Sequence, residues 1–174
     1  MLNDKPLNIL LVDDDPLSRN SVQRWTEQTD FCCQLTMANS CAEALSWLRD
    51  QRFDIVLLDY PSDDSTGLEI LTDVIDTPVI FITEQGNEQT VVKAMQQGAD
   101  EFLIKGVDGD YLKLLLKTIR SVVQKKQTEQ QLRWTQFALD HAPDPVFCMR
   151  KDGSFAYVNE AACRALGYSV ALIT

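Results

Sequence analysis

The segment Asn8–Asp15, NILLVDDD, is a short apolar run that ends in three aspartates, and its pattern indicates the fold. Three later segments repeat this arrangement, each an apolar run followed by one polar residue. They are DIVLL at 54–58 before Asp59, PVIFI at 78–82 before Thr83, and EFLI at 101–104 before Lys105. Short runs that are mostly apolar are typical of strands covered on both faces, as in a parallel sheet.

Helical patterns separate these strands. Asp15 and Pro16 suit the N-cap and first position of one helix, and Ser40 and Glu43 have the spacing of a capping box. Four helices are expected, at 16–28, 40–50, 67–75 and 87–97, and a weaker strand is expected at 34–38. Alternating strands and helices imply parallel pairing through right-handed crossovers. We therefore predict an α/β fold, a doubly wound five-stranded parallel sheet.

The composition excludes several classes of protein. The chain has 174 residues and a formal net charge of −10, because 26 acidic residues outnumber 16 basic ones. This balance argues against direct nucleic-acid binding and against a polybasic membrane anchor. No apolar run approaches the roughly 18 residues of a membrane span, and the N-terminus does not fit a signal peptide. Five cysteines without a CxxC pair suit a reducing compartment, so we expect a cytoplasmic protein.

The residues that end the strands form a candidate site. In open parallel sheets, ligands bind outside the carboxyl ends of the strands, so Asp13, Asp14, Asp59, Thr83 and Lys105 are expected to converge. Crowded carboxylates repel one another, and Mg²⁺ with oxygen ligands relieves that repulsion. One carboxylate can then attack phosphorus while the ammonium and hydroxyl contact the phosphoryl oxygens. Taken singly, Thr83 also suits a backbone-bonded hydroxyl and Lys105 a solvated lysine; their shared sheet edge favours chemistry.

The C-terminal part has a different pattern. Helical apolar spacing begins near Asp108, and no glycine or proline interrupts it from Tyr111 to Ala142. A helix longer than about 25 residues suggests a coiled coil or a connector. Beyond it, the segments PVFCM at 145–149 and SFAYV at 154–158 predict a hairpin, and 159–166 reads as a helix.

The strand-end motifs together resemble a known family. ILLVDDDP, DIVLLD with a glycine eight residues later, PVIFIT and GADEFLIK are similar, in that order, to the receiver domain of two-component response regulators, over residues 7 to about 124. The resemblance implies a flavodoxin-like fold that accepts a phosphoryl group from a histidine kinase or phosphotransfer protein, with Asp59 as the phosphoacceptor. It further implies Mg²⁺ binding by Asp13, Asp14, Asp59 and the carbonyl of Pro61, and phosphoryl contact or switching by Thr83, Lys105 and Phe102.

Three positions depart from the family's pattern. Asp63 stands where the family usually has proline, Glu84 follows the switch hydroxyl where a small residue is usual, and Gly106 replaces the proline that usually follows the lysine. These departures leave an alternative open. The chain would then be a pseudo-receiver, a protein-interaction or dimerisation module that acts without phosphorylation. The intact acidic residues and Lys105 favour a receiver that can be phosphorylated over this pseudo-receiver.

The C-terminal segment has its own resemblance. FALDHAPDPVFCMRKDGSFAYVNEAACRALGYS is similar to the opening of a PAS domain, over about residues 134–170. The predicted layout is a receiver domain at 1–124, a signalling or coiled-coil linker helix at 125–141, and the truncated start of a PAS domain at 142–174. We expect phosphorylation to act through the helix on an output module outside this chain. The chain itself is expected to be no enzyme beyond self-dephosphorylation.

Other interpretations concern assembly and chemistry. A homodimer is expected through the receiver face or the linker helix, with no membrane partner. In a constitutive scaffold, by contrast, the helix at 111–142 would dimerise whatever the state of Asp59. An independent hydrolase is disfavoured because no second catalytic base is evident. His141 lies within the PAS-like sequence, which favours a structural role over phosphate transfer.

Overall fold

The computed structural model describes residues 5–59, 74, 76–83, 88–106 and 111–167. The chain divides into two units, Met1–Gln124 and Lys125–Thr174. Among the helices of the described residues, none combines the length and apolar character needed to cross a membrane.

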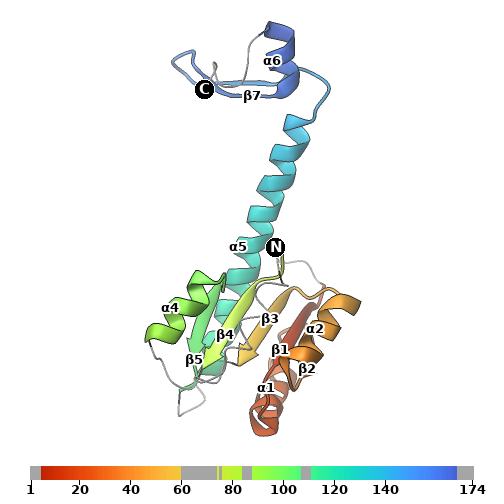
Figure 1. The fold of residues 1–174 in the computed structure, drawn as a ribbon, viewed down its shortest axis with the longest axis vertical. Coiled ribbons are helices and arrows are strands. Elements are labelled where there is room, and N and C mark those ends of the chain that lie inside the picture. Colours follow the sequence, from red (N-terminus) through yellow and green to blue (C-terminus); the bar gives the residue numbers. More distant parts are fainter. Residues whose placement is uncertain (1–4, 60–73, 75, 84–87, 107–110, 168–174) are drawn as a thin grey trace. The chain divides into compact units, whose positions relative to one another are not determined.

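The first unit is built on a five-stranded parallel sheet (Figure 1). Its strands are β1 (Leu7–Val12), β2 (Cys33–Ala38), β3 (Ile55–Asp59), β4 (Val79–Thr83) and β5 (Glu101–Ile104). The order β2-β1-β3-β4-β5 confirms the predicted fold class. Because β2 and β3 lie on opposite sides of β1, the strand order reverses there, and ligand sites of such sheets form beside that switch point.

Helices cover both faces of this sheet. One face carries α1 (Pro16–Gln28) and the start of α5 (Tyr111–Asp140), and the other carries α2 (Cys41–Asp50) and α4 (Glu88–Gln96). Alternate residues of β1 serve opposite layers: Ile9 and Leu11 pack with α1 and α5, whereas Leu10 and Val12 pack toward α2. Burial of each such side chain contributes roughly 1.5–3 kcal/mol to the stability of the folded state. The helix predicted at 67–75 falls largely outside the described residues.

The polar turn between β1 and α1 is fixed by a helix cap. The Asp15 carboxylate accepts hydrogen bonds from the backbone N–H groups of Leu17, at 3.0 Å, and Ser18, at 3.2 Å. This confirms Asp15 as the N-cap, and it starts α1 directly behind Asp13 and Asp14. The first turn of α1 therefore faces the edge of the sheet where the strand-end residues gather.

The second unit contains the last part of α5, the antiparallel strands β6 (Phe147–Met149) and β7 (Phe155–Val158), and α6 (Glu160–Leu166). The buried Asn159 side chain joins its parts. Its amide donates to the carbonyls of Leu139, at 3.1 Å, and Asp144, at 2.9 Å, and its oxygen accepts from the N–H of Ala162, at 2.8 Å. This helix, hairpin and short helix are consistent with the start of a PAS domain.

Candidate functional site

The site lies at the carboxyl ends of the parallel strands. Asp13 and Asp14 follow β1, and Lys105 follows β5, as expected. Asp59 and Thr83 are the last residues of β3 and β4, whereas the sequence predicted each of them as the first residue after its strand. Parallel pairing brings these ends to the same edge, because Asp59 pairs with Ile82 and the next residue of β4 is Thr83.

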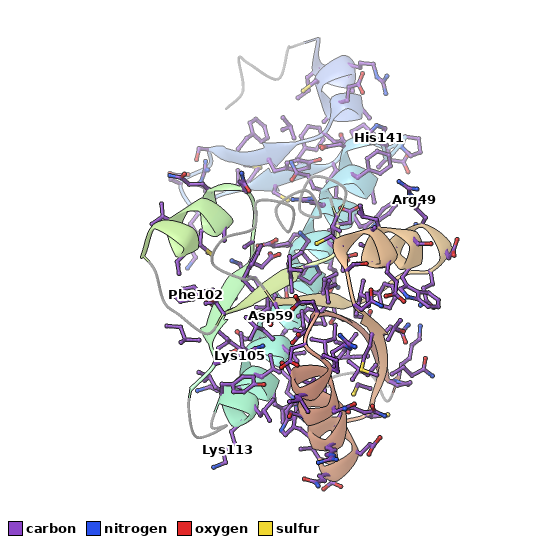
Figure 2. All side chains as sticks on the ribbon, turned by 60° about the horizontal axis from the view of Figure 1, so that its bottom comes forward. Arg49, Asp59, Phe102, Lys105, Lys113 and His141 are labelled. Atoms are coloured by element: carbon purple, nitrogen blue, oxygen red, sulfur yellow. The ribbon has the colours of Figure 1, made fainter. Side chains whose placement is uncertain are left out.

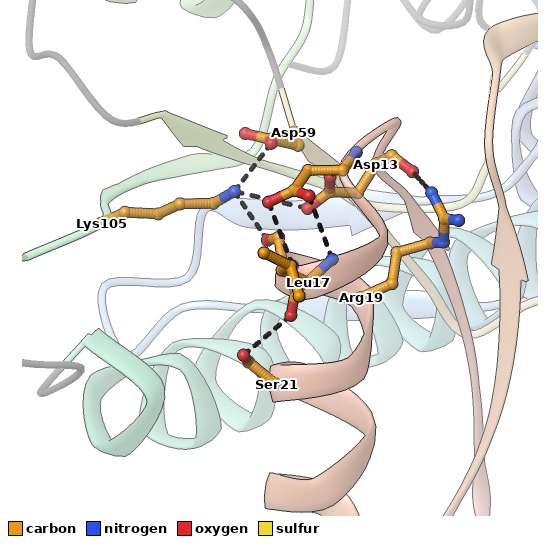
Figure 3. A network of polar contacts seen from close by, with 8 residues as sticks. Asp13, Leu17, Arg19, Ser21, Asp59 and Lys105 are labelled. Atoms are coloured by element: carbon orange, nitrogen blue, oxygen red, sulfur yellow. Dashed lines mark hydrogen bonds and ion pairs between the residues drawn. The ribbon is translucent and has the colours of Figure 1, made fainter.

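Lys105 lies at the centre of the site. Its Nζ is 2.7 Å from Asp59 Oδ2 and 3.3 Å from Asp13 Oδ2. Figure 2 shows Lys105 beside Asp59, and Figure 3 shows the lysine reaching toward the carboxylates of Asp13 and Asp59. The side chains of Lys105, Asp13 and Asp59 are 12%, 1% and 15% exposed, so these charges interact with little solvent between them.

Three carboxylates form a cluster suited to a metal ion. One oxygen from each of Asp13, Asp14 and Asp59 lies within 4.8 Å of the others. These hard, anionic oxygens are the donor set that Mg²⁺ takes in proteins, with waters completing its coordination shell. Asp14 is exposed and Asp13 is buried, so the cluster is open to solvent on one side. The residues present therefore fit a magnesium site.

Burial and neighbouring charges set the protonation of this cluster. Burial raises the pKa of Asp59 to about 6; the Lys105 ammonium opposes this rise, and the Asp13 charge adds to it. Burial lowers the pKa of Lys105, but the hydrogen bond and the charge of Asp59 outweigh that effect, so its pKa is raised. At neutral pH the site therefore holds a charged lysine between carboxylates.

Further bonds hold Asp13 in place. Its Oδ1 accepts a hydrogen bond from the N–H of Asp15 at 2.8 Å, and its backbone carbonyl accepts one from the Arg19 guanidinium at 2.6 Å. Figure 3 shows Arg19 reaching back from α1 to this carbonyl. The turn after β1 is thus fixed from both sides, which orients the buried Asp13 carboxylate toward Lys105.

Thr83 and Phe102 occupy different surroundings. Thr83 is buried at the end of β4, and its carbonyl accepts a hydrogen bond from the N–H of Lys105 at 2.7 Å. Phe102 pairs with Phe81 across β4 and β5 and is partly buried against the apolar layer that contains Ala94 of α4. The backbone thus joins Thr83 to Lys105, while Phe102 packs toward α4.

Some positions named from the sequence lie outside the described residues, namely Pro61, Asp63 and Glu84. Gly106 lies within the residues that the structure describes, and it is exposed. A Cβ built on Gly106 meets no atom within 4 Å, so steric crowding does not require glycine there.

Three residues near the site were not predicted from the sequence. The Ser18 hydroxyl accepts a hydrogen bond from Lys105 at 2.9 Å, and Arg19 holds Asp13. Burial raises the pKa of Tyr111, and the charges of Lys105, Asp13 and Asp59 also influence this pKa, so Tyr111 lies near the site. The sequence carries no signal for the contact between Ser18 and Lys105, because this contact depends on how α1 is rotated about its axis.

Comparisons with known proteins identify the family of this chain. A model of the response regulator receiver domain matches residues 9–117, and a PAS domain model matches residues 132–174. The transcriptional regulatory protein GlrR of Escherichia coli K12 is 30% identical over 147 residues, 82% of this chain and 32% of its own length. The two-component response regulator ARR2 of Arabidopsis thaliana is 34% identical over 128 residues, 71% of this chain and 18% of its own length.

Solved structures share the fold. A CheY-like receiver domain protein of Methanospirillum hungatei JF-1 superposes with a TM-score of 0.62 at 23% identity, covering 72% of this chain and 99% of that protein. The chemotaxis response regulator CheY4 of Vibrio cholerae gives 0.57 at 22% identity, covering 66% and 99%. The chain spans about a third or less of the length of the curated relatives quoted above. With its receiver model matched over most of the chain, this protein belongs to the response regulator receiver family of two-component signalling and carries a segment that matches a PAS domain.

Proposed function

We propose that this chain is a phosphorylation-dependent receiver, which takes a phosphoryl group on Asp59 from a histidine kinase or a phosphotransfer protein. The observation that carries the proposal is the position of Lys105, whose ammonium lies 2.7 Å from Asp59 and 3.3 Å from Asp13 at the strand-end edge. A nucleophilic carboxylate beside a fixed cation and a second acidic group suits phosphoryl transfer, in which charge on the phosphoryl oxygens must be stabilised.

The chemistry follows from the carboxylate itself. Since the pKa of Asp59 is about 6, most of this group is ionised at neutral pH and can act as a nucleophile. One of its oxygens bonds to phosphorus while the bond from phosphorus to the donor imidazole nitrogen breaks. The imidazole leaves with that electron pair and takes a proton. Lys105 then contacts a phosphoryl oxygen, and the Thr83 hydroxyl is proposed to contact another.

The metal is proposed to be held by Asp13, Asp14 and Asp59, with the Pro61 carbonyl as the family resemblance implies. Mg²⁺, when bound, neutralises charge on the phosphoryl oxygens. The residues of the chain do the remaining work. Asp15 and Arg19 keep the acidic turn in place, and a backbone hydrogen bond joins Lys105 to Thr83 on the neighbouring strand.

We further propose the layout of receiver at 1–124, linker helix at 125–141 and start of a PAS domain at 142–174, in a cytoplasmic protein. Phosphorylation is proposed to act through Thr83 and Phe102 on α5 and so on an output module that this chain does not contain. Trp134 and Phe137 are 71% and 55% exposed, and their rings lie 6.2 Å apart on the linker helix, which supports this face as a surface for homodimerisation. Sedimentation with and without beryllofluoride separates a switched dimer from a constitutive one.

Beryllofluoride, which mimics a phosphoryl group on a carboxylate, tests the proposal without depending on the phosphoryl lifetime. In ¹⁹F NMR we expect a bound fluoride resonance for the full chain with Mg²⁺, and none for Asp59→Asn or without metal. Lys105→Ala is expected to weaken binding about tenfold or more, because it removes a charged contact to the fluorides. If the folded wild-type chain gives no bound signal with Mg²⁺, the phosphorylation-independent pseudo-receiver becomes the better account.

A further inference from the structure

The ammonium of Lys105 has a third partner besides the two carboxylates. Its Nζ donates to Ser18 Oγ at 2.9 Å, to Asp59 Oδ2 at 2.7 Å and to Asp13 Oδ2 at 3.3 Å. A lysine ammonium has three N–H donors and no acceptor, so these three bonds use its whole capacity. Ser18 is the only uncharged one of the three partners.

The position of Ser18 is set by the start of α1. The serine lies three residues after the N-cap, and its own N–H is bound by the Asp15 carboxylate at 3.2 Å. The hydroxyl is thus presented from a capped helix turn, and the side chain is half-buried. Because the turn is anchored in this way, Ser18 offers Lys105 a fixed acceptor on the side opposite the sheet.

The carboxylates that bind Lys105 also belong to the cluster that fits a metal ion. Asp13 and Asp59 bind the lysine, and both belong to the carboxylate cluster that fits Mg²⁺. A divalent ion ligated by these oxygens would lie close to the ammonium and repel it, because like charges a few ångströms apart in a half-buried site are poorly screened. Any group that holds the ammonium in the cluster therefore weakens metal binding.

We propose that Ser18 is a positioning residue that holds the Lys105 ammonium among the carboxylates and thereby sets the Mg²⁺ affinity of the site. The inference deepens the proposed receiver function and rests on it. In the metal-free chain the hydroxyl stabilises the lysine between Asp13 and Asp59. When the metal binds, the ammonium gives up part of this arrangement, and the bond to Ser18 is part of what must be given up.

The test is the dissociation constant of Mg²⁺ alone, measured by isothermal titration calorimetry on the full chain at constant ionic strength. Ser18→Ala is expected to tighten Mg²⁺ binding about three- to tenfold, since a hydrogen bond to a charged donor no longer favours the metal-free arrangement. Ser18→Thr keeps a hydroxyl and is expected to restore the wild-type constant. The matched control is Ser21→Ala, one turn further along α1, because the Ser21 hydroxyl bonds to the Leu17 carbonyl at 2.8 Å (Figure 3).

A double-mutant cycle tests whether Ser18 acts through the lysine. In a Lys105→Met background, Ser18→Ala is expected to leave the Mg²⁺ dissociation constant unchanged, which a general structural effect of Ser18 would not do. An unchanged constant for Ser18→Ala in the wild-type background overturns the inference and leaves the proposed function intact. A wild-type chain that binds neither Mg²⁺ nor beryllofluoride overturns the proposed function, and the inference with it.

Discussion

At the end of β3, the Asp59 carboxyl lies beside the Asp13 carboxylate, with the Lys105 ammonium bound to both. Burial is the main cause that raises the pKa of Asp59 to about 6, against 3.8 for an ordinary aspartate. Between these values the native state binds more protons at Asp59 than the unfolded chain does. The free energy of unfolding therefore falls as pH rises through this window and stays level above it.

This fall of the free energy of unfolding with rising pH leads to a prediction for the metal-free chain. On raising the pH from about 4.5 to 7, the wild type should lose stability relative to Asp59→Asn, and the melting temperature of the variant should exceed that of the wild type by about 3–6 °C at pH 7. Calorimetry in the presence of a chelator measures the difference. Asp50→Asn, at an exposed position on α2, is the control. Equal pH dependence of wild type and Asp59→Asn would contradict the assigned environment.

How much could be predicted at this scale depends on what fixes each residue. Asp13, Asp59, Thr83 and Lys105 could be placed together because parallel strands end at one edge of a sheet. Ser18 could not, since its contact with Lys105 depends on the rotation of α1 about its axis, which the Asp15 cap sets. No strand or helix pattern in the sequence records that rotation.

Among the elements, the strands and helices of the receiver unit that the structure describes followed from apolar runs and caps. The ends of β3 and β4 lie one residue later than predicted, because the backbone ladders extend to the pairs of Asp59 with Ile82 and of Thr83 with Ile104. The apolar pattern could not show this, since backbone pairing rather than side-chain hydrophobicity decides where a strand ends.

In the second unit, Asn159 joins α5, the segment before β6 and α6, and its removal is predicted to loosen all three. Asn159→Ala deletes bonds to the Leu139 and Asp144 carbonyls and to the N–H of Ala162 at a fully buried site. We expect the free energy of local unfolding to fall by about 2–4 kcal/mol, because buried backbone groups are left unpaired. The N–H of Val146 also donates to Asn159 Oδ1, at 3.0 Å, so hydrogen exchange at the amides of Val146 and Ala162 should accelerate correspondingly.

The matched control for that experiment is Glu160→Ala on the neighbouring residue. Glu160 forms only an exposed ion pair with Arg164, at 3.6 Å with both side chains 68% exposed. Exposed pairs of this kind are worth little, so exchange should change by less than about tenfold. Unchanged exchange in Asn159→Ala would contradict the structural role of Asn159.

For the whole molecule, metal binding should stabilise the receiver unit. Three carboxylates within 4.8 Å of one another repel in the absence of a cation, and a ligand that binds only the folded state raises the free energy of unfolding. With Mg²⁺ at ten times its dissociation constant, the gain is about 1.4 kcal/mol, or about 3–6 °C in the melting temperature. Differential scanning calorimetry at matched ionic strength measures this shift.

Asp13→Asn is the control for metal stabilisation, because it removes the charge of a buried member of the cluster and keeps its size. Its melting temperature should respond to Mg²⁺ much less than that of the wild type. An equal shift in both proteins would mean that the ion acts away from the strand-end carboxylates.

Intact-mass spectrometry shows whether Asp59 accepts a phosphoryl group with the help of Mg²⁺. The full chain is incubated with acetyl phosphate and Mg²⁺, beside Asp59→Asn and a chelated sample. The assignment of Asp59 as the acceptor predicts the mass of one added phosphoryl group in the wild type and none in either control. Added mass that persists in Asp59→Asn, or that forms equally without metal, would contradict it.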